Sequence, residues 1–255
     1  MGKNSNFIKF LGTAGARFVM IRQLRSSAGL WLKYKSTNLL IDPGPGCLVR
    51  CHSCRPKLDP SKLDGIILTH KHLDHSGDIN VMIEAMTAGG FKKRGKLFVT
   101  SDALGKEGVV FKYLEKKVGK IERLKKKKFK VKDIDFSAPI RNMHSVETYG
   151  VKFYLGGQVV AYISDTKKFD KLVKAYSDST VLILNVVFYE PKPGYGHLSL
   201  PEAIGLVKEI KPKKTIFTHF GMTILRQKPY ELEKKVRSET GLDIKFAYDG
   251  MSLAI

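Results

Sequence analysis

Three of the seven histidines stand within six residues, in the segment Thr69-His70-Lys71-His72-Leu73-Asp74-His75. The segment follows the apolar run GIIL at 65–68, which is typical of a buried β-strand, and a helical pattern begins just after it. A loop between a strand and a helix is held in a rigid frame, and functional side chains often lie on such loops. The segment therefore places three imidazoles and one carboxylate where they could act together.

The spacing of these four side chains favours metal binding. Side chains alternate along an extended segment, so His70 and His72 point to one side and can share one cation. Asp74 and His75 come next and can turn toward a second, neighbouring position. The alternative is a histidine-rich loop with no ligand role, but imidazoles this close would repel one another when protonated. We therefore predict a metal site at this loop.

The pattern His-x-His-x-Asp-His resembles the signature of the metallo-β-lactamase superfamily, and other segments agree with that family in order and spacing. Asp42 ends NLLID before PGPG, where the family has an aspartate that supports the metal loop through hydrogen bonds. His144 in RNMHSVETYG, Asp165 in YISDT and His219 in FTHFG match the remaining metal-site residues. The resemblance covers nearly the whole chain, and it implies an α/β (α+β) fold, the four-layer αββα sandwich.

The resemblance also implies how the ligands are shared between two cations. The expected sets are His70, His72 and His144 for one cation and Asp74, His75 and His219 for the other, with Asp165 bridging them. Imidazole and carboxylate ligands suit Zn, which we favour, and also Mn or Fe. Two such divalent ions can hold a bridging hydroxide that attacks the substrate. Each residue could alternatively have a purely structural role, as a structural histidine or as an aspartate, such as Asp42, that starts a turn.

The ligand set does not name the substrate, because the same chemistry serves phosphodiesters, lactones, thioesters and lactams. His197 in GYGHLSLPEA resembles the additional histidine of the phosphodiesterase branch, which includes ribonuclease Z, and we predict His197 and Asp74 as catalytic residues. A capping or core role is the alternative for His197. FLGTAGA at 10–16, followed by Arg22 to Ser27, resembles the opening of the same branch. The glycine- and proline-rich insertion with which ribonuclease Z clamps tRNA is absent from this sequence.

The predicted function is that of a metal-dependent hydrolase that cleaves phosphodiester bonds, in nucleic acid or in a small cyclic or aryl phosphodiester. A hydrolase of a lactone, thioester or other carboxylic derivative is one alternative. The other is a basic nucleic-acid-binding protein whose metal site is not catalytic.

The charge of the chain favours an anionic partner. Lys and Arg number 45 against 24 Asp and Glu, a formal net charge of +21. Between Lys112 and Lys132, eleven basic residues stand with only two acidic ones, so this segment carries 11 − 2 = +9. Such a field attracts polyanions, nucleic acid among them. A solvated lysine-rich surface is the alternative, and only Tyr113 and Phe129 could offer a stacking face in this segment.

The composition, with 43% hydrophobic and 27% charged residues, is that of ordinary globular proteins. No linker or repeat divides the sequence, so we expect one domain over 1–255. No run approaches the roughly 18 apolar residues of a membrane span. The start MGKNSNFIKFLG lacks the apolar core of a signal peptide, which indicates a cytoplasmic protein without membrane partners.

The cysteines form a weaker signal. All three lie in CLVRCHSC, as Cys47, Cys51 and Cys54. In a cytoplasmic chain, clustered thiols suggest metal or redox chemistry before a disulfide, and with His52 they could form a Cys₃His zinc site. Cys51 and His52 are adjacent and would have difficulty reaching one ion, so we favour incidental, partly buried thiols.

The remaining elements must position these residues. Helical periodicity marks 78–88, 200–210 and 229–240, and Ser199 with Pro201 predicts the start of the second of these helices. Short β-branched and aromatic runs predict strands at 7–11, 30–34, 38–42, 65–69, 96–100, 151–155, 159–164, 180–188, 214–218 and 243–248. This alternation predicts two sheets with helices outside.

Overall fold

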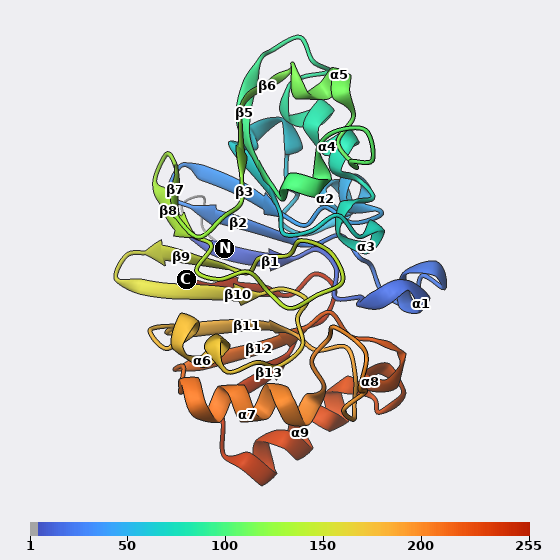
Figure 1. Ribbon diagram of the computed structural model, residues 1–255, viewed down its shortest axis with the longest axis vertical. Helices are drawn as coiled ribbons and strands as arrows, with labels where there is room; N and C mark the ends of the chain where they lie inside the picture. The colour runs from blue at the N-terminus through green and yellow to red at the C-terminus, as the bar shows by residue number, and fades with distance from the viewer. Residues whose placement is uncertain (1–4) are drawn as a thin grey trace.

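The protein is a sandwich of two β-sheets with helices on both outer faces, as the computed structural model shows (Figure 1). The structure describes residues 5–255, so the first four residues of the segment that indicated a cytoplasmic location lie outside it. The predicted αββα architecture is confirmed. Within the described range, no helix has the length and apolar character that crossing a membrane requires.

The first sheet is formed mainly by the N-terminal half of the chain. Its strand order is β14-β1-β2-β3-β4-β5-β6. The strands are β1 Phe7–Phe10, β2 Leu30–Tyr34, β3 Thr37–Ile41, β4 Gly65–Leu68, β5 Arg94–Val99, β6 Val118–Arg123 and β14 Ser252–Ala254. Strands β3 to β6 run parallel to one another, so their carboxyl ends meet at one edge of the sheet.

The second sheet has the order β13-β12-β11-β10-β9-β8-β7. Its strands are β7 Lys128–Val131, β8 Ile134–Ser137, β9 Val151–Leu155, β10 Gln158–Ile163, β11 Val181–Asn185, β12 Lys214–Thr218 and β13 Ile244–Phe246. Strands β10 to β13 are parallel. The β11 sequence VLILN is buried along its whole length, as expected for a strand with a sheet on one face and helices on the other.

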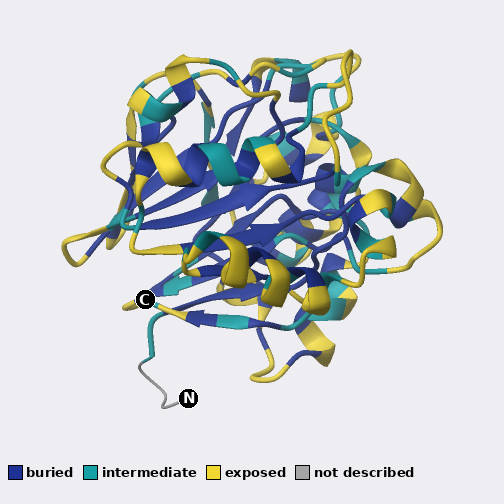
Figure 2. Ribbon diagram, turned by 90° about the horizontal axis from the view of Figure 1, so that it is seen from below, coloured by how far each residue is buried: buried dark blue, intermediate teal, exposed yellow. Residues whose placement is uncertain are grey.

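Helices cover the outer faces of both sheets. On the first sheet lie α2 Cys47–Ser53, α4 Ile79–Met86 and α5 Lys112–Glu115, and on the second lie α6 Lys171–Tyr176, α7 Leu200–Ile210 and α9 Pro229–Thr240 (Figure 1). Short helices complete the chain at α1 Ala16–Ile21, α3 Leu73–Ser76 and α8 Met222–Arg226, with single 3₁₀ turns at Pro60–Lys62 and Ser101–Ala103. The helices expose one side and bury the other against dark, buried strands (Figure 2).

Helix α7 begins as its sequence predicts. Ser199 is the N-cap, and its backbone N–H donates to the Glu202 side chain over 2.8 Å, within a capping box. Pro201 lies in the first turn, where its missing N–H costs no hydrogen bond. Lys211, just past the helix, adopts a left-handed conformation and ends it.

The predicted elements and the observed ones differ mainly where charge obscures the pattern. The predicted strand 180–188 ends at Asn185, because residues 186–188 leave the sheet to begin the loop toward α7. Strands β6, β7 and β8 were not predicted, since charged residues on their exposed faces hide short apolar alternation such as that of KFKV in β7. Strand β14 has only three residues, too few for a recognisable pattern.

The two sheets are joined by a core rich in aromatic side chains. Phe136 in β8 is fully buried, and its ring meets Phe98 of the first sheet edge-on, with 4.9 Å between centroids. The same ring stacks on Phe129, with 5.0 Å between centroids, and lies 5.8 Å from Phe153. Phe136 therefore fills the contact between β5 on one side and the edge of the second sheet on the other.

We expect Phe136→Ala to lower the free energy of unfolding by about 3–5 kcal/mol, because it removes buried area and leaves a cavity between the sheets. Urea denaturation followed by circular dichroism measures the change. Phe91→Ala is the matched control, since that ring is 93% exposed and its loss should change stability by no more than about 0.5 kcal/mol. Equal midpoints for the two variants would contradict the prediction.

Candidate metal centre

The predicted site residues come together at one edge of the sandwich, where parallel strands of both sheets end. His70 follows β4, Asp165 follows β10 and His219 follows β12. His144 comes from the loop between β8 and β9, and His197 from the loop between β11 and α7. The fold thus collects side chains that are far apart in the sequence.

Three histidines form the first group. The ligand atoms of His70, His72 and His144 all lie within 4.8 Å of one another. Nδ1 of His72 and Nε2 of His144 are 3.1 Å apart. The His70 side chain is fully buried, whereas His72 is partly exposed at the start of α3. This is the set expected to hold one cation.

The second group is formed by Asp74, His75 and His219, again within 4.8 Å of one another. Oδ2 of Asp74 lies 3.5 Å from Nε2 of His219 and 3.9 Å from Nε2 of His75. Asp74 and His75 lie on the short helix α3, so the turn that the sequence indicated after His72 is helical. This group matches the expected second set.

Asp165 lies between the two groups. Its carboxylate oxygens lie 3.8 Å from Nε2 of His70 and 4.0 Å from Nε2 of His144, on the first side. They lie 3.5 Å from Nε2 of His75 and 3.4 Å from Nε2 of His219, on the second side. A carboxylate in this position can serve both groups, as predicted for a bridging ligand.

The donor atoms fit divalent transition metals. The nitrogens His70 Nε2, His75 Nε2, His197 Nδ1 and His219 Nε2 are buried and have no hydrogen-bond partner within residues 5–255. Unpartnered buried polar atoms are costly, and they call for an explanation. Ligands about 2.0–2.2 Å from one tetrahedral ion are about 3.3–3.6 Å apart, close to several of the separations given above. The residues present therefore suit bound cations.

The other ring nitrogens are held by the protein. Nδ1 of His144 donates to the carbonyl of Gly196 over 2.8 Å, and Nδ1 of His75 donates to Asp42 Oδ2 over 3.0 Å. Nδ1 of His70 lies 3.2 Å from Oγ1 of Thr69. Such contacts fix the orientation of a metal-binding imidazole and leave its remaining nitrogen free to ligate.

Asp42 supports the centre without entering it. Its carboxylate accepts hydrogen bonds from the Thr69 backbone N–H (2.7 Å) and hydroxyl (2.8 Å) and from His75. It also accepts one from the Tyr162 hydroxyl over 3.2 Å. Thr69 and Tyr162 were not predicted as site residues. The position of Thr69 beside His70 was the available signal for it, whereas Tyr162 reaches Asp42 from the other sheet.

The electrostatics of the centre differ from residue to residue. Burial, reinforced by the nearby His75, lowers the pKa of His70 well below its ordinary value, which keeps its lone pair available. Burial also opposes the charged form of His75, but Asp74, Asp42 and Asp165 raise its pKa well above its ordinary value. Burial works against ionised Asp165 as well, yet the surrounding imidazoles, His219 foremost, hold its pKa well below its usual range.

Two glycines allow the ligand segments to approach other backbone closely. A Cβ on Gly15 would lie 2.0 Å from the carbonyl oxygen of His219, and one on Gly44 would lie 2.0 Å from that of Asp74. His219 itself has a φ of 60°, which a histidine rarely adopts. Small residues in the segments FLGTAGA and PGPG thus allow the backbone of the ligand segments to pack closely against them.

The segment from Arg22 to Ser27 and the three cysteines are not part of the histidine–aspartate groups. The predicted opening segment Arg22 to Ser27 includes Arg25, which donates to Thr13 Oγ1 and to the Ala247 carbonyl, so it is committed to structure. Cys47, Cys51 and Cys54 are free and buried, and they form no ligand cluster with one another or with His52 in the part of the chain that is described. Cys54 instead donates to the carbonyl of Pro56.

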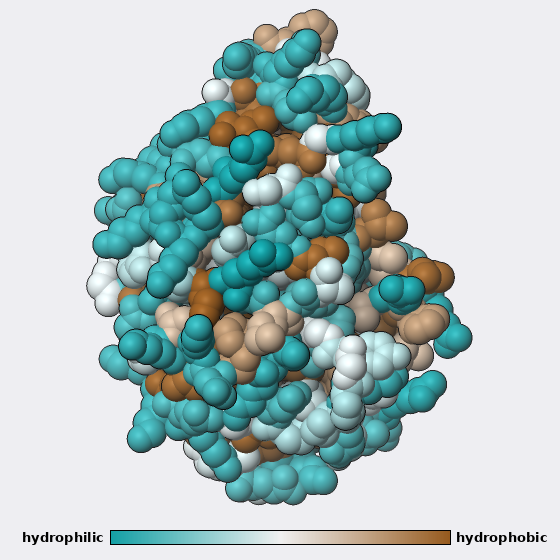
Figure 3. All heavy atoms as spheres, in the orientation of Figure 1, coloured by the Kyte–Doolittle hydropathy of each residue, from teal (hydrophilic) through white to brown (hydrophobic). Residues whose placement is uncertain are grey.

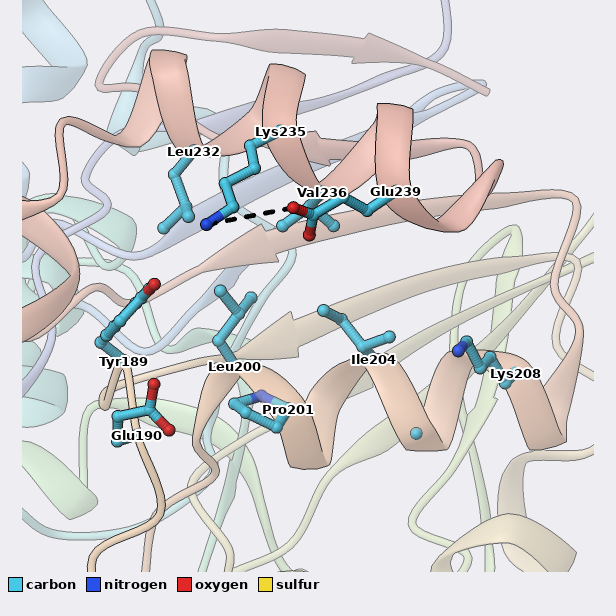
Figure 4. Close-up of a pocket in the computed structure, with 11 residues that line it drawn as sticks. Tyr189, Glu190, Leu200, Pro201, Ile204, Lys208, Leu232, Lys235, Val236 and Glu239 are labelled. Carbon is cyan, nitrogen blue, oxygen red and sulfur yellow. Dashed lines mark ion pairs between the residues drawn. The ribbon is translucent and has the colours of Figure 1, made fainter.

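A separate hollow of about 380 Å³ lies between α7 and α9 (Figure 4). Leu200 and Ile204 of α7 face Leu232 and Val236 of α9 across it (Figure 4). None of the histidine and aspartate groups described above borders it. The chemistry that the sequence indicated therefore belongs to the strand-end site.

The fold is an αββα sandwich, and its histidine–aspartate groups could hold metal ions. The family model described as "Beta-lactamase superfamily domain" matches residues 37–220, so the chain belongs to that superfamily of hydrolases. The predicted membership is confirmed.

Comparison of sequences adds three relatives. An uncharacterised protein of Methanocaldococcus jannaschii is 27% identical, over 97% of this chain and 94% of its own. The probable metallo-hydrolase YhfI of Bacillus subtilis is 24% identical, over 76% of this chain and 80% of its own. Ribonuclease Z of Thermococcus kodakarensis is 36% identical over only 77 residues, which is 30% of this chain and 23% of that enzyme.

Solved structures share the fold along its full length. The crystal structure of YhfI from Bacillus subtilis has a TM-score of 0.79 at 18% identity, covering 99% of this chain and 100% of that one. A diphosphatase of the PhnP family has a TM-score of 0.74 at 20% identity, and the match covers 98% of this chain and 97% of that one. The short form of human tRNase Z has a TM-score of 0.72 at 16% identity, and the match covers 98% of this chain and 99% of that one.

We expect Asp42→Asn to weaken Zn²⁺ binding by about 10–100-fold, because the amide supports His75 and Thr69 less well than the carboxylate does. Asn tolerates the left-handed backbone at this position, where φ is 53°, so the fold should be retained. Competition with a chromogenic chelator measures the affinity. Asp135→Asn, at an exposed position of β8, is the control, and an affinity loss of the same size there would count against the role of Asp42.

Proposed function

We propose that this protein is a metal-dependent hydrolase with a binuclear site and that it cleaves phosphodiester bonds. The observation that carries the proposal is the position of His197 beside two complete ligand groups. Nδ1 of His197 lies 3.4 Å from Oδ2 of Asp165, within a fourth group of potential ligands that also contains His144. A histidine next to a centre of this kind suits a substrate with several charged oxygens.

The residues that would hold the two cations are the two groups described above, with Asp165 between them. When bound, two divalent cations, of which Zn is our choice ahead of Mn or Fe, stabilise negative charge on phosphoryl oxygens and make a water-derived nucleophile available at neutral pH. The chain's own residues do the remaining work, which is to orient the substrate and to move protons.

We assign His197 the role of stabilising or protonating phosphate oxygens. Its ring lies edge-on to His144, with 4.9 Å between centroids, and 5.9 Å from that of Phe188. Burial lowers the pKa of His197 to about 4, so the ring is neutral at neutral pH and can donate one N–H to a phosphoryl oxygen. The side chain is 16% exposed, which leaves it accessible to a substrate.

Asp74 is the proposed proton acceptor. Its side chain is 11% exposed, more than those of His75 and Asp165, and it faces His219 from the open side of the centre. A carboxylate there can accept a proton from an attacking water molecule.

Two of the structural neighbours support the choice of substrate class, since one is a diphosphatase of the PhnP family and another is the short form of human tRNase Z. The net charge of +21 suits an anionic substrate, nucleic acid included. Three free thiols agree with the reducing conditions of a cytoplasmic location, which we keep as part of the proposal.

We expect the purified protein to hold close to two transition-metal ions per chain and to hydrolyse an activated aryl phosphodiester. His72→Ala should remove this activity, because it takes one imidazole from the first group. Elemental analysis and chromogenic hydrolysis measure the two quantities. Wild-type protein that stays inactive after reconstitution with Zn²⁺, Mn²⁺ and Fe²⁺ in turn would overturn the proposed function.

We expect His197→Ala to lower kcat for the phosphodiester by about 10²–10⁴-fold, since a donor to the phosphoryl oxygens is lost. The same variant should retain its rate on a lactone or thioester if the wild type hydrolyses one, because those substrates have no phosphoryl oxygens. His52→Ala is the matched control at an exposed position of α2. Equal losses on both substrate classes would favour a hydrolase of carboxylic derivatives.

A further inference from the structure

The basic segment 112–132 does not form one uniform surface. It contains α5, β6 and the start of the second sheet at β7, and the β6–β7 connection crosses from one sheet to the other. Arg123 ends β6 and Lys128 begins β7, so Lys125 to Lys127 lie at the crossing. Because β6 is parallel to β4 and two strands away from it, this crossing lies at the same edge of the sheet as the metal centre.

The cations at this edge differ from those at the opposite edge in how they are paired. Lys130 lies 3.6 Å from Asp135, and Lys132 lies 2.6 Å from Asp64, both toward the far end of the β7–β8 hairpin. By contrast, four side chains at the near end form no ion pair or side-chain hydrogen bond anywhere in residues 5–255: Arg123, Lys125, Lys126 and Lys128. Unpaired, exposed cations are free to meet an anion.

A hollow of about 620 Å³ adjoins these cations. Arg123, Lys125 and Lys127 line it on one side. The carboxylates that also line it are already engaged: Glu122 pairs with Lys120 and Lys127, Glu115 pairs with Lys112, and Glu147 accepts from the Ser101 backbone N–H. The Ser101 N–H does not neutralise Glu147, so within residues 5–255 the lining has two cations without an ion pair, Arg123 and Lys125, against one such carboxylate. The unpaired charge at the hollow is therefore net positive, and the unpaired Lys126 and Lys128 lie close by in the chain. Hydrophilic residues cover this side of the molecule, over β7 and β8 (Figure 3).

The hollow and the metal centre share one loop of the chain. Glu147 and Tyr149 line the hollow, and both belong to the loop that carries His144. The Tyr149 backbone N–H donates to the Thr69 carbonyl over 3.1 Å, directly beside His70. Lys71, between two of the predicted ligands, lies 3.8 Å from Asp102, which follows the lining residue Ser101. With strands about 4.8 Å apart, the crossing lies on the order of 10 Å from the β4 strand end.

We propose that this hollow, lined by the unpaired cations of the β6–β7 crossing, binds the backbone of a single-stranded nucleic acid whose neighbouring phosphodiester lies at the metal centre. The proposal rests on the proposed function and names its substrate as a polymer rather than a small phosphodiester. A small substrate would be held entirely at the ligands, and cations two strands away would not reach it. A polymer extends from the centre across this edge of the sheet.

Recognition here depends on charge rather than on base identity. Of the aromatic side chains in the segment, Phe129 is buried in the core, and Tyr113 lies on α5 beside Glu84, 3.4 Å from its carboxylate. Tyr149, which also lines the hollow, is only 8% exposed, so the hollow offers ammonium and guanidinium groups to phosphates and little aromatic face on which bases could stack. Binding should be tolerant of sequence and should fall steeply with salt.

The test compares two triple variants that remove the same charge. R123A/K125A/K126A acts at the hollow, and K171A/K174A/K208A removes three exposed lysines from α6 and α7. Fluorescence anisotropy with a labelled single-stranded RNA of about 12 nucleotides gives affinity against salt, and a gel confirms that the RNA stays intact. We expect the first variant to bind roughly 100-fold more weakly at 0.1 M salt, with a log–log slope shallower by about 2. The control should change affinity by no more than about threefold.

Equal losses in the two triple variants, or an unchanged slope in the first, would overturn the inference. K125E alone, at an exposed loop position that lines the hollow, gives a second reading if the triple variant does not fold, and it should weaken binding in the same direction. Hydrolysis of the aryl phosphodiester by the wild type is measured in parallel. If the aryl phosphodiester is hydrolysed but RNA binding does not depend on the hollow, the proposed function stands and this inference fails. If RNA binding depends on the hollow but nothing is hydrolysed, the proposed function fails and only the binding of RNA at the hollow remains.

Discussion

The structure depends on one buried carboxylate surrounded by imidazoles. Asp165 has five histidine side chains within 4.0 Å, and burial would make its negative charge costly if they were absent. Burial is also costly for the several ring nitrogens around it that have no hydrogen-bond partner in residues 5–255. Cations between the groups would lower both costs together.

The parallel strands make this arrangement possible. Four segments that are separated by many residues in sequence reach the site because β3, β4, β10 and β12 all end at one edge of the sandwich. Side chains placed just after a strand inherit the rigidity of the sheet, so the donors are held without long loops of their own. The two exceptions, His144 and His197, come from longer loops and are linked by the hydrogen bond from His144 to Gly196.

The sequence predicted the fold and the residues that converge at this edge, partly from local patterns and partly from the resemblance to a known family. The run from His70 to His75 is a compact motif, and Asp42, Asp165 and His219 each follow an apolar strand. Contacts between sheets have no such local signal, so the hydrogen bond from Tyr162 to Asp42 could not be predicted. Strands β6 to β8 were also missed, because pairing partners, rather than composition, turn a lysine-rich segment into sheet.

The hydrogen bond between Tyr162 and Asp42 has a consequence for the molecule as a whole. Asp42 belongs to the first sheet and Tyr162 to the second, and the same carboxylate also holds His75. A cation on His75 would therefore be tied, through a single side chain, to the seam between the two halves of the sandwich. Ion binding to the folded state adds to its stability by mass action, so heat resistance and ion occupancy should rise and fall together in this protein.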